Sequence, residues 1–340
     1  MRTRAIAAVI VAGSLVLAGC SDSGNNTAAP SATNETKGTD STAGSTDANI
    51  DFVTIATGGT SGPYYQIGAT MSQILNRELG ADSSVQATGA SVENIQLLVD
   101  GNAEVAFAMG DATRQAIDGT GPFEGKGKVN ELKAITALYP NYVQIVTTSK
   151  SGIKSVEDLR GKRVGVGDKN SGVELNAQMI LDAHGMNYDD INEDFLSYSD
   201  AIDQMKNGQI DAAFVTSGLP NSSVMDLVTT EDVVVVPIEG AGMDALLKKY
   251  PFFDKSAIPG GTYDEAEDVP TAAITNQLLV SPSLSDDQVY AITKALFENL
   301  DEIHSAHNAA KGITLESVED GLATELHPGA RRYFEEVGAL

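Results

Sequence analysis

The chain has 340 residues, of which 22 are Lys or Arg and 47 are Asp or Glu, so its formal net charge is −25. A surface this acidic repels phosphate backbones and anionic lipid headgroups, which argues against nucleic-acid binding. The single cysteine excludes a disulfide scaffold and a zinc site with several cysteine ligands, while 42% apolar residues are enough to build a hydrophobic core.

The N-terminus has the pattern of a secretion signal. Two arginines precede an apolar run at residues 6–18, which is too short to span a bilayer because a spanning helix needs about 20 residues. The small residues before Cys20 resemble a bacterial lipobox, so we predict that residues 1–19 are cleaved and that Cys20 carries lipid. The alternative is an ordinary cleaved signal in which Cys20 has no role.

Residues 20–49 are predicted to be a lipid anchor followed by a disordered tether. After Cys20 the segment contains small and polar residues and no aromatic or large aliphatic side chain. Such a composition cannot bury enough apolar surface to offset the entropy of ordering. The lipid on Cys20 would anchor the protein to the cell membrane and place residues 50–340 outside the cytoplasm.

The body begins with strands and helices in alternation. Helical spacing of apolar residues is found at about 63–79 and at 91–99, and β-type runs at 52–56, 85–87 and 104–109. This β-α-β-α-β order with short connections predicts a parallel sheet with right-handed crossovers. A further helix is expected at 111–117 and a glycine-rich loop at 119–127.

A second unit of the same kind begins near residue 150. A capping-box pattern at 155–158 predicts a short helix. Strands are expected at 163–167, 210–215, 233–236 and 272–280, and helices at 171–183, 200–207 and 221–228. The valine run at 233–236 predicts a strand buried on both faces. A loop is expected at 258–269, and Ser285 is predicted to begin one long helix that continues through Ile303.

Two turns between a strand and the next helix are candidate ligand sites. They lie at 60–63 and 168–172, beyond the carboxyl ends of strands, where free amide groups and the helix dipole favour an anion. Pro63 suits the first helical turn, and Ser171 with Glu174 fits a capping box. The alternative for each turn is an ordinary capped helix start. Two such sites facing each other suit a ligand with two acidic ends, or one acidic and one polar end.

Three further features lie at strand ends. The segments 88–91 and 215–218 are expected to face the same cleft. Asp111 directly follows the strand at 104–109, where its carboxylate would either accept from a ligand amine or cap the next helix. Both interpretations of Asp111 remain open.

The sequence has none of the usual enzyme signatures. Residues 58–62 lack the glycine spacing of dinucleotide sites, and there is neither a phosphate loop nor a nucleophile elbow. His304 and His307 share a helix face but are expected to be solvated rather than metal ligands, and His184 is expected to cap carbonyls at a helix end. A hydrolase with two carboxylates is left open, although no spacing nominates a pair. We therefore predict a protein that is not an enzyme and has no catalytic residues, no metal and no cofactor.

Several segments of the body match motifs of a known family. They are residues 56–60, 62–68, 88–94 (TGASVEN), Asp111, 138–140, 211–214, 218–220, 250–252, 258–263 and 269–271. Over essentially all of residues 50–340 the chain resembles the TAXI family, the receptors of one class of TRAP transporter.

This resemblance implies a two-lobed α/β fold of the type II periplasmic-binding-protein kind, in which each lobe is a mainly parallel sheet flanked by helices. Lobe one would comprise residues 50–145 and 278–340, and lobe two residues 146–277, with the ligand cleft between them. The hinge is expected near 142–149 and 271–280.

The resemblance also implies a function. The receptor would capture glutamate, glutamine or a dicarboxylate such as 2-oxoglutarate and deliver it to a fused TRAP membrane permease driven by an ion gradient. The alternative is a receptor that serves an ATP-driven importer or a sensor kinase. We expect a monomer.

The ligand contacts implied by the resemblance come from both lobes. They are Thr60, Ser61, Tyr64, Ser91, Asn94 and Asp111 on lobe one, and Ser171, Gly172, Ser217 and Asn221 on lobe two. The chain departs from the family at 170–174, where Val173 lacks the usual hydroxyl group and so removes a possible ligand donor.

Overall fold

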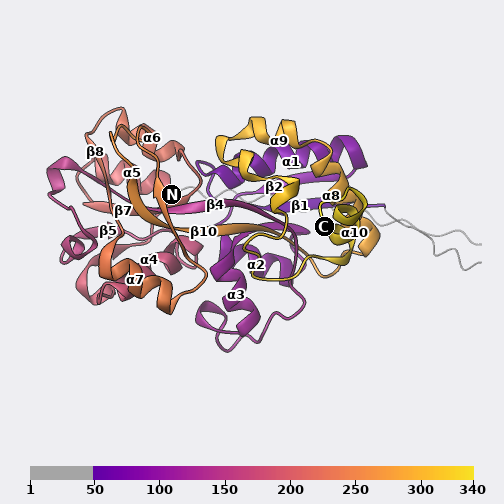
Figure 1. The fold of residues 1–340 in the computed structure, drawn as a ribbon, viewed down its shortest axis with the longest axis horizontal. Coiled ribbons are helices and arrows are strands. Elements are labelled where there is room, and N and C mark those ends of the chain that lie inside the picture. The colour runs from indigo at the N-terminus through magenta and orange to yellow at the C-terminus, as the bar shows by residue number, and fades with distance from the viewer. Residues whose placement is uncertain (1–48) are drawn as a thin grey trace, which may run out of the picture. The chain divides into compact units, whose positions relative to one another are not determined.

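The computed structural model describes residues 49–340 (Figure 1). The predicted signal, the lipidation of Cys20 and almost all of the tether therefore lie outside the described residues. Within the described part of the chain, none of the helices combines the length and the apolar character needed to cross a membrane.

One ten-stranded mixed sheet organises the body. Its strands follow the order β2-β1-β3-β10-β4-β7-β5-β6, with β8 paired to β4 and β9 paired to β10. The strands are β1 (Phe52–Ala56), β2 (Asp82–Gln86), β3 (Val105–Met109), β4 (Lys133–Thr148), β5 (Arg163–Gly165), β6 (Asn192–Asp194), β7 (Ala212–Ser217), β8 (Val233–Val236), β9 (Asp254–Ile258) and β10 (Val269–Val280).

The sheet has two parallel parts joined by two long antiparallel strands. In the first half, β1 pairs in parallel with β2 and β3, and in the second half β5 pairs in parallel with β6 and β7. Strands β4 and β10 lie between them, antiparallel to each other and to their other neighbours, and run through both halves (Figure 1). The predicted lobe boundaries, between residues 145 and 146 and between residues 277 and 278, fall inside β4 and β10.

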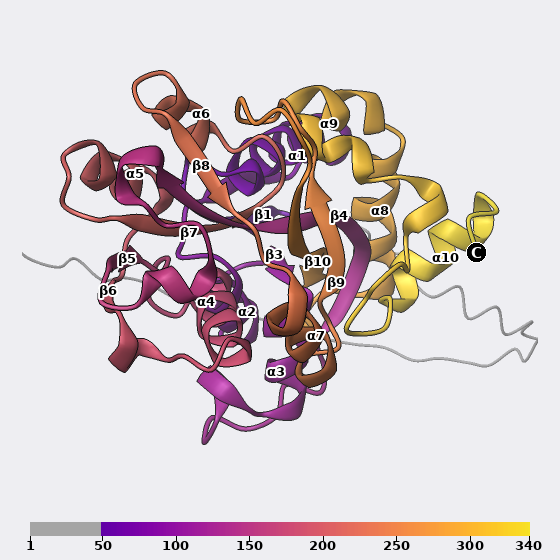
Figure 2. The ribbon, with the colours of Figure 1, turned by 60° about the vertical axis from the view of Figure 1, so that its left-hand side comes forward.

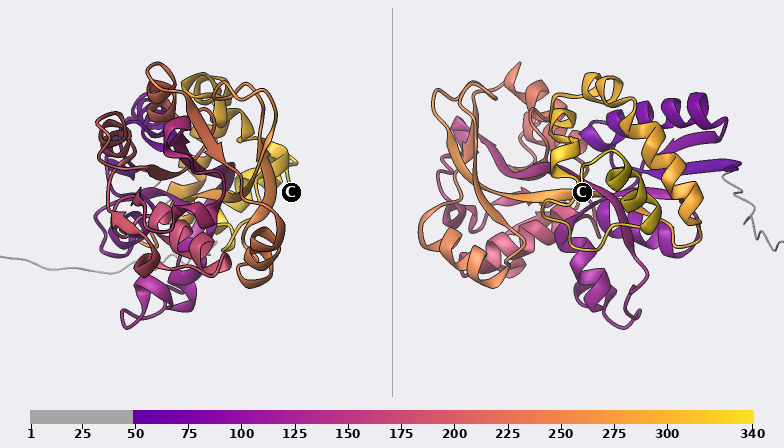
Figure 3. Two further views of the ribbon diagram at one scale, coloured as in Figure 1. Left: turned by 90° about the vertical axis from the view of Figure 1, so that its left-hand side faces the viewer. Right: turned by 45° about the vertical axis from the view of Figure 1, so that its right-hand side comes forward.

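Helices cover both halves. They are α1 (Pro63–Leu79), α2 (Ser91–Val99), α3 (Gly110–Asp118), α4 (Gly172–Ala183), α5 (Tyr198–Lys206), α6 (Ser222–Val228), α7 (Gly240–Lys249), α8 (Asp286–Phe297), α9 (Leu300–Ala306) and α10 (Pro328–Glu336). After β10 the chain returns to the first half, where α8 and α9 pack against α1 and α10 packs against α8 (Figures 2 and 3).

Most of the alternating pattern predicted from the sequence is confirmed. The parallel β1-β2-β3 unit is present, α2 has the predicted bounds, and Pro63 occupies the first turn of α1. The capping box of Ser155 and Asp158 begins a short 3-10 helix at Val156–Leu159, as predicted. Ser171 caps α4, but the predicted box with Glu174 is only half correct, because the Glu174 carboxylate accepts from the amide of Asn170.

The longest strand, β4, was not predicted. Its sequence contains Pro140, which lacks an amide hydrogen and normally interrupts a strand. Pro140 stands opposite Thr275 of β10, and the register of the pair shifts between Thr275 and Gln277. This irregularity lets the strand continue through the proline.

Three predictions of local structure are wrong. The single long helix after Ser285 is two helices, because the chain leaves the helical path at Glu298 and Asn299 between α8 and α9. The predicted loop at 258–269 is one residue too long at each end, since Ile258 ends β9 and Val269 begins β10. Strand β8 is only half-buried at its first two valines, because it pairs with β4 alone.

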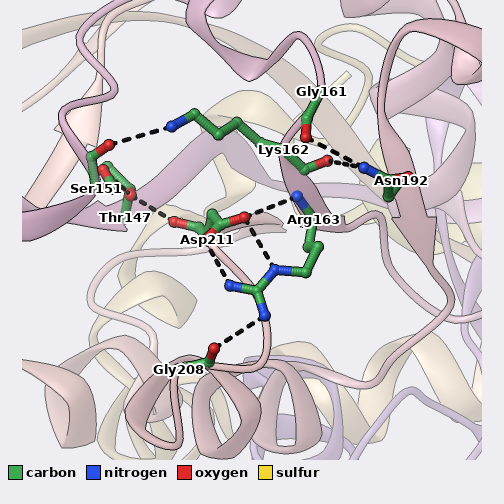
Figure 4. A network of polar contacts seen from close by, with 8 residues as sticks. All are labelled: Thr147, Ser151, Gly161, Lys162, Arg163, Asn192, Gly208 and Asp211. Atoms are coloured by element: carbon green, nitrogen blue, oxygen red, sulfur yellow. Dashed lines mark hydrogen bonds and ion pairs between the residues drawn. The ribbon is translucent and has the colours of Figure 1, made fainter.

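Asp211, which belongs to one of the family motifs, fastens β5 to β7. Its carboxylate accepts from the backbone amide of Arg163 at 2.9 Å and from the guanidinium Nε and Nη2 at 3.1 and 2.7 Å (Figure 4). Arg163 also donates from Nη1 to the Gly208 carbonyl, and Thr147 of β4 donates to the Asp211 carbonyl. Pairing with Arg163 lowers the pKa of Asp211. The motif residue is therefore structural and forms no part of the cavity described below.

Candidate functional site

A cavity of about 50 Å³ lies where the carboxyl ends of the parallel strands of the two halves meet. In α/β sheets this is the usual place for a ligand. The first half contributes Gly58, Gly59, Gly62, Pro63, Tyr64, Gly89, Ala90 and Met109. The second half contributes Asp168, Ser171, Val173, Ser197, Tyr198, Thr216 and Ser217, and β4 contributes Asn141.

Four helix N-termini open onto the cavity. The N-cap residues on its wall are Gly62 of α1, Ala90 of α2, Ser171 of α4 and Ser197 of α5. Ser171 and Ser197 accept from backbone amides of their own helices, at 3.0 and 3.2 Å. The partial positive charge of the helix ends favours an anionic group here.

The turns around the cavity contain unusual backbone. Ala90 has a φ of 73° and Asn170, in the turn before α4, has a φ of 61°. Residues other than glycine rarely adopt this left-handed backbone region. Residues that do adopt it concentrate at ligand sites, where the surrounding structure holds them in place.

A network of buried amides and hydroxyls forms one side of the cavity. The Tyr64 hydroxyl donates to Asn276 Oδ1 at 2.5 Å and receives a long hydrogen bond of 3.5 Å from Asn141 Nδ2. Asn276 Nδ2 in turn donates to the carbonyl of Tyr139 at 2.7 Å. Burial, followed by the nearby Tyr139, raises the pKa of Tyr64, so the hydroxyl stays protonated and neutral.

Two buried polar atoms of the wall have no hydrogen-bond partner among the described residues. They are Asn141 Oδ1 and Thr216 Oγ1. Leaving such an atom unpaired costs about 1–3 kcal/mol, so a bound solute with matching groups would recover that energy. These two atoms are therefore candidate solute contacts.

Asp168 is the one charged side chain among the described residues of the wall. Burial raises its pKa, and the neighbouring carboxylates of Asp200 and Glu93 raise it further. Lys169 beside it stands over the ring of Phe195, 5.8 Å from the centroid. The cavity thus combines helix ends that favour an anion with one carboxylate that favours a donor.

Three of the ten predicted ligand residues line the cavity: Tyr64, Ser171 and Ser217. Three others hold the surrounding backbone instead. Ser91 Oγ accepts from the Met109 amide, and Asn94 Nδ2 donates to the carbonyls of Thr57 and Phe107. Asn221 caps α6 and donates to Ser217 Oγ.

Three more of the ten mark places where the two halves touch. Ser222 Oγ of the second half donates to the Ser61 carbonyl at 2.6 Å. Gly172 faces Ser91 and Met109 of the first half. Asn176 of α4 donates to Asp111 at 2.7 Å. The tenth residue, Thr60, is exposed in the turn before α1.

The capping interpretation of Asp111 is wrong. The N-cap of α3 is Met109, and Asp111 lies within the first turn of the helix, completely buried. The direct contact of its carboxylate is the Asn176 amide from the other half.

Sequence reasoning missed Asn141, Tyr198 and Met109 on the wall. Asn141 belongs to the unpredicted strand β4, and Met109 appeared only as an apolar strand residue. Tyr198 begins α5 after the short and exposed β6, and its hydroxyl donates to the Thr216 carbonyl at 2.7 Å. The signal that could have found it is Ser197, a capping residue ahead of that helix.

The histidines agree only partly with expectation. His184 is the C-cap residue of α4, and its backbone amide donates to the Ile180 and Leu181 carbonyls, whereas its ring contacts the Glu157 carboxylate at 2.8 Å. His304 Nε2 lies 2.8 Å from the Ile313 carbonyl, and His307 accepts from the Ala309 amide, so neither ring is simply solvated. Burial lowers the pKa of His307. Among residues 49–340, no group of three or more His, Cys, Asp or Glu side chains is placed to hold a metal.

Comparison with known proteins agrees with this architecture. The model of a family described as the NMT1-like family matches residues 55–338. PhnD1 from Prochlorococcus marinus, solved with methylphosphonate, superposes with a TM-score of 0.53 at 12% identity over 85% of this chain and 99% of that one. A protein from Bordetella bronchiseptica gives 0.53 at 18% identity, over 85% and 99% of the two chains.

A third structure, the binding-protein component of an ABC phosphonate transporter from Pseudomonas aeruginosa, gives a TM-score of 0.50 at 12% identity over 80% of this chain and 83% of that one. At these identities the structures share the fold. The predicted fold class, a two-lobed α/β architecture of the periplasmic-binding-protein kind, is confirmed.

Proposed function

The chain belongs to the NMT1-like family, and on that premise we propose that it is a receptor that captures a small acidic or amino-acid-like solute outside the cytoplasmic membrane. The observation that carries this proposal is the cavity shared by the two halves, with four helix N-termini on its wall. A solute there would contact both halves at once and so stabilise them in the closed arrangement.

In the proposal, the two halves are the lobes of a hinged receptor. Strands β4 and β10 run through both halves, and the segments 142–149 and 271–280 would flex as the lobes open. Opening of the lobes would break contacts between the halves, such as that of Ser222 with the Ser61 carbonyl, and would widen the way to the cavity.

The wall suggests the chemistry of the solute. An acidic group would lie at the helix N-termini, and Asn141 Oδ1 and Thr216 Oγ1 would pair with neutral polar groups. Asp168 would accept from an ammonium or another donor of the solute. Glutamate and glutamine fit this pattern, and 2-oxoglutarate fits it if Asp168 is protonated. A small phosphonate such as the methylphosphonate bound to PhnD1 is the competing solute class.

The proposed partner is a membrane importer. Delivery to an ATP-driven importer is favoured, because one structure of the same fold is a component of an ABC phosphonate transporter. The resemblance to the TAXI family supports the second candidate, an ion-driven TRAP permease. Anchoring through lipid on Cys20 and a monomeric state complete the proposal.

A binding function, rather than an enzymatic one, suits the cavity. The described residues of its wall include no cysteine, histidine or lysine. Of its three serines, Ser171 and Ser197 accept from helix amides, and Ser217 accepts from the Asn221 side chain. A nucleophile paired with a base is the usual sign of covalent catalysis, and these residues do not form one.

A thermal-unfolding screen tests the proposal. The purified chain is unfolded and refolded to remove any bound solute, then heated with glutamate, glutamine, 2-oxoglutarate or methylphosphonate. A solute at about 100 times its Kd should add about 2.7 kcal/mol of stability and raise Tm by several degrees. A refolded protein that responds to none of them would contradict the proposed solute class.

A further inference from the structure

A buried hydrogen bond joins the two halves beside the cavity. Asn176 Nδ2 of α4 donates to Asp111 Oδ2 of α3 at 2.7 Å, and both side chains are 0% exposed. The second oxygen of each residue, Asp111 Oδ1 and Asn176 Oδ1, has no hydrogen-bond partner among the described residues. Two acceptor oxygens on one pair of contacting residues thus lack a donor.

A single proton would complete this pair. If Asp111 carries a proton on Oδ1, its hydroxyl can donate to Asn176 Oδ1 while Asn176 continues to donate to Oδ2. Carboxylic acid and amide would then form two hydrogen bonds, and neither oxygen would be unsatisfied. An ionised Asp111 would instead be a buried charge held by the polar contacts of Asn176 and of the first turn of α3.

No ion pair among the described residues compensates a charge on Asp111. The elements that pack against α3 are β3, β10, α2, α4 and the 3-10 helix Gly121–Phe123. Of these, β3, β10 and the 3-10 helix contain no titratable side chain. The neutral hydroxyl of Tyr64 on α1 also lies nearby, and the negative charge of Asp111 contributes to the raised pKa of Tyr64.

The charged residues on α2, α3 and α4 have partners of their own. Glu93 accepts from the Gly89 amide, Arg114 pairs with Asp118, Glu174 accepts from Asn170, and Asp182 pairs with Lys249. Asp111 therefore has no cation to neutralise it within the described chain.

We propose that Asp111 and Asn176 form a proton-dependent latch, so that closure of the two halves takes up one proton at Asp111. This inference rests on the proposed function, because it assumes that the halves open and close around a solute.

The shift in the pKa of Asp111 has the direction that the latch requires. Burial raises the pKa of Asp111 to about 7 in the closed arrangement, and the hydrogen bond from Asn176, together with the nearby backbone amides of Asp111 and Ala112, only partly opposes the rise. With α4 moved away, water would reach Asp111 and its pKa would return to about 4. Because the closed form has the higher pKa, protonation favours closure, and the ratio of closed to open molecules should rise about tenfold between pH 8 and pH 6.

A cross-linking rate measures this ratio without any solute. Cysteines replace Ser61 and Ser222, which touch across the halves, and Cys20 is changed to serine so that only the new pair reacts. A short bis-methanethiosulfonate reagent joins the pair when the protein is closed. The rate is divided by the rate for the same protein carrying Asp111→Asn, so that the pH dependence of thiol reactivity cancels.

The latch predicts that this quotient is about tenfold larger at pH 6 than at pH 8. Asp118→Asn is the matched control, because Asp118 is an exposed acid on the same helix. When it is introduced into both proteins of the comparison, the quotient of their cross-linking rates should not change. An equal quotient at both pH values would overturn the proposal. If Asp111→Asn does not fold, Asn176→Asp serves instead, because it places two carboxylates together. As the pH rises, the cross-linking rate of this variant should fall relative to that of the parent.

The outcome is separate from that of the solute screen. A protein that responds to no solute but shows the tenfold change would retain the latch and lose the proposed solute class. A protein that binds glutamate with a pH-independent quotient would retain the receptor function and lose the latch.

Discussion

Gly172 at the start of α4 lies directly against Met109 at the end of β3. A Cβ atom on Gly172 would stand 2.1 Å from Met109 Cε and 2.8 Å from Ser91 Oγ. The two residues belong to different halves of the sheet, so the absent side chain allows the halves to approach. In the proposed receptor Gly172 would therefore permit closure, and the direct ligand contact that the family resemblance implied for it stays a prediction.

Gly172→Ala should weaken solute binding while leaving the fold intact. The added methyl group can displace the flexible end of Met109 but not Ser91, so it opposes closure. Overpacking typically costs about 1–3 kcal/mol, which corresponds to a loss of affinity of about five- to hundredfold. Calorimetric titration with the best solute of the thermal screen measures it, and Met109→Ala in the same chain should restore part of the loss. Unchanged affinity in the single variant would show that the halves do not meet here in the bound state.

Tyr64→Phe should lower the free energy of unfolding by about 1–3 kcal/mol, because Asn276 Oδ1 would be left buried without a donor. Urea unfolding with an unchanged m-value measures the loss. Tyr290→Phe is the control, since the Tyr290 hydroxyl donates to Glu336 on the exposed surface and its removal should have little effect. Equal losses in the two variants would contradict the buried network.

Asp168→Asn should separate two classes of solute. If Asp168 accepts from an ammonium group, the substitution removes a charged hydrogen bond worth about 1.5–3 kcal/mol, so affinity for glutamate or glutamine falls about tenfold to hundredfold. Affinity for methylphosphonate, which has no amine, should stay the same or increase because a like charge is removed. The measurement is the ratio of the two affinities in parent and variant. A parallel loss for both solutes would argue that Asp168 only holds the turn before α4.

Asp211→Asn should destabilise the protein at neutral pH by about 1 kcal/mol, a modest figure because Arg163 is 45% exposed. The folded state has the lower pKa for Asp211, so its contribution is present above the unfolded value of about 4 and is lost as the pH falls through the folded value. The difference in unfolding free energy between parent and variant should therefore be smaller at about pH 3 than at pH 7. Glu325→Gln, which removes an exposed pair with Lys133, should have a smaller effect at pH 7. A constant difference between parent and Asp211→Asn at both pH values would contradict the ionic contribution.

The parallel units of the fold could be predicted because their signals are local. Helical spacing and short β-type runs identified β1, α1 and α2, and Ser171 was correctly assigned as a helix start. The long strand β4 could not be found this way, because Pro140 is tolerated only through the register shift opposite β10. That shift is a property of the pair and does not appear in either segment alone.

The cavity lies at the predicted strand ends, but only part of its wall was predicted. Tyr64, Ser171 and Ser217 were found because they lie at the ends of predicted strands or the starts of predicted helices. The side chains of Asn94 and Asn221 are polar too, yet both have other partners. Asn94 donates to the distant Thr57 carbonyl, which only the folded chain brings within reach, and Asn221 accepts from the Ser223 amide as the cap of α6. Asp111 shows the same limit, since its partner Asn176 lies in the other half of the sheet.

The most direct test of the receptor function is to identify what the protein carries when it is purified. The chain is isolated without denaturation and then unfolded, and the released small molecules are analysed by mass spectrometry and added back to the refolded chain. We expect one small solute per chain, bearing an acidic group, that restores the original Tm. A purified chain that releases no such molecule, and whose refolded form has the same Tm with and without its native extract, would contradict it.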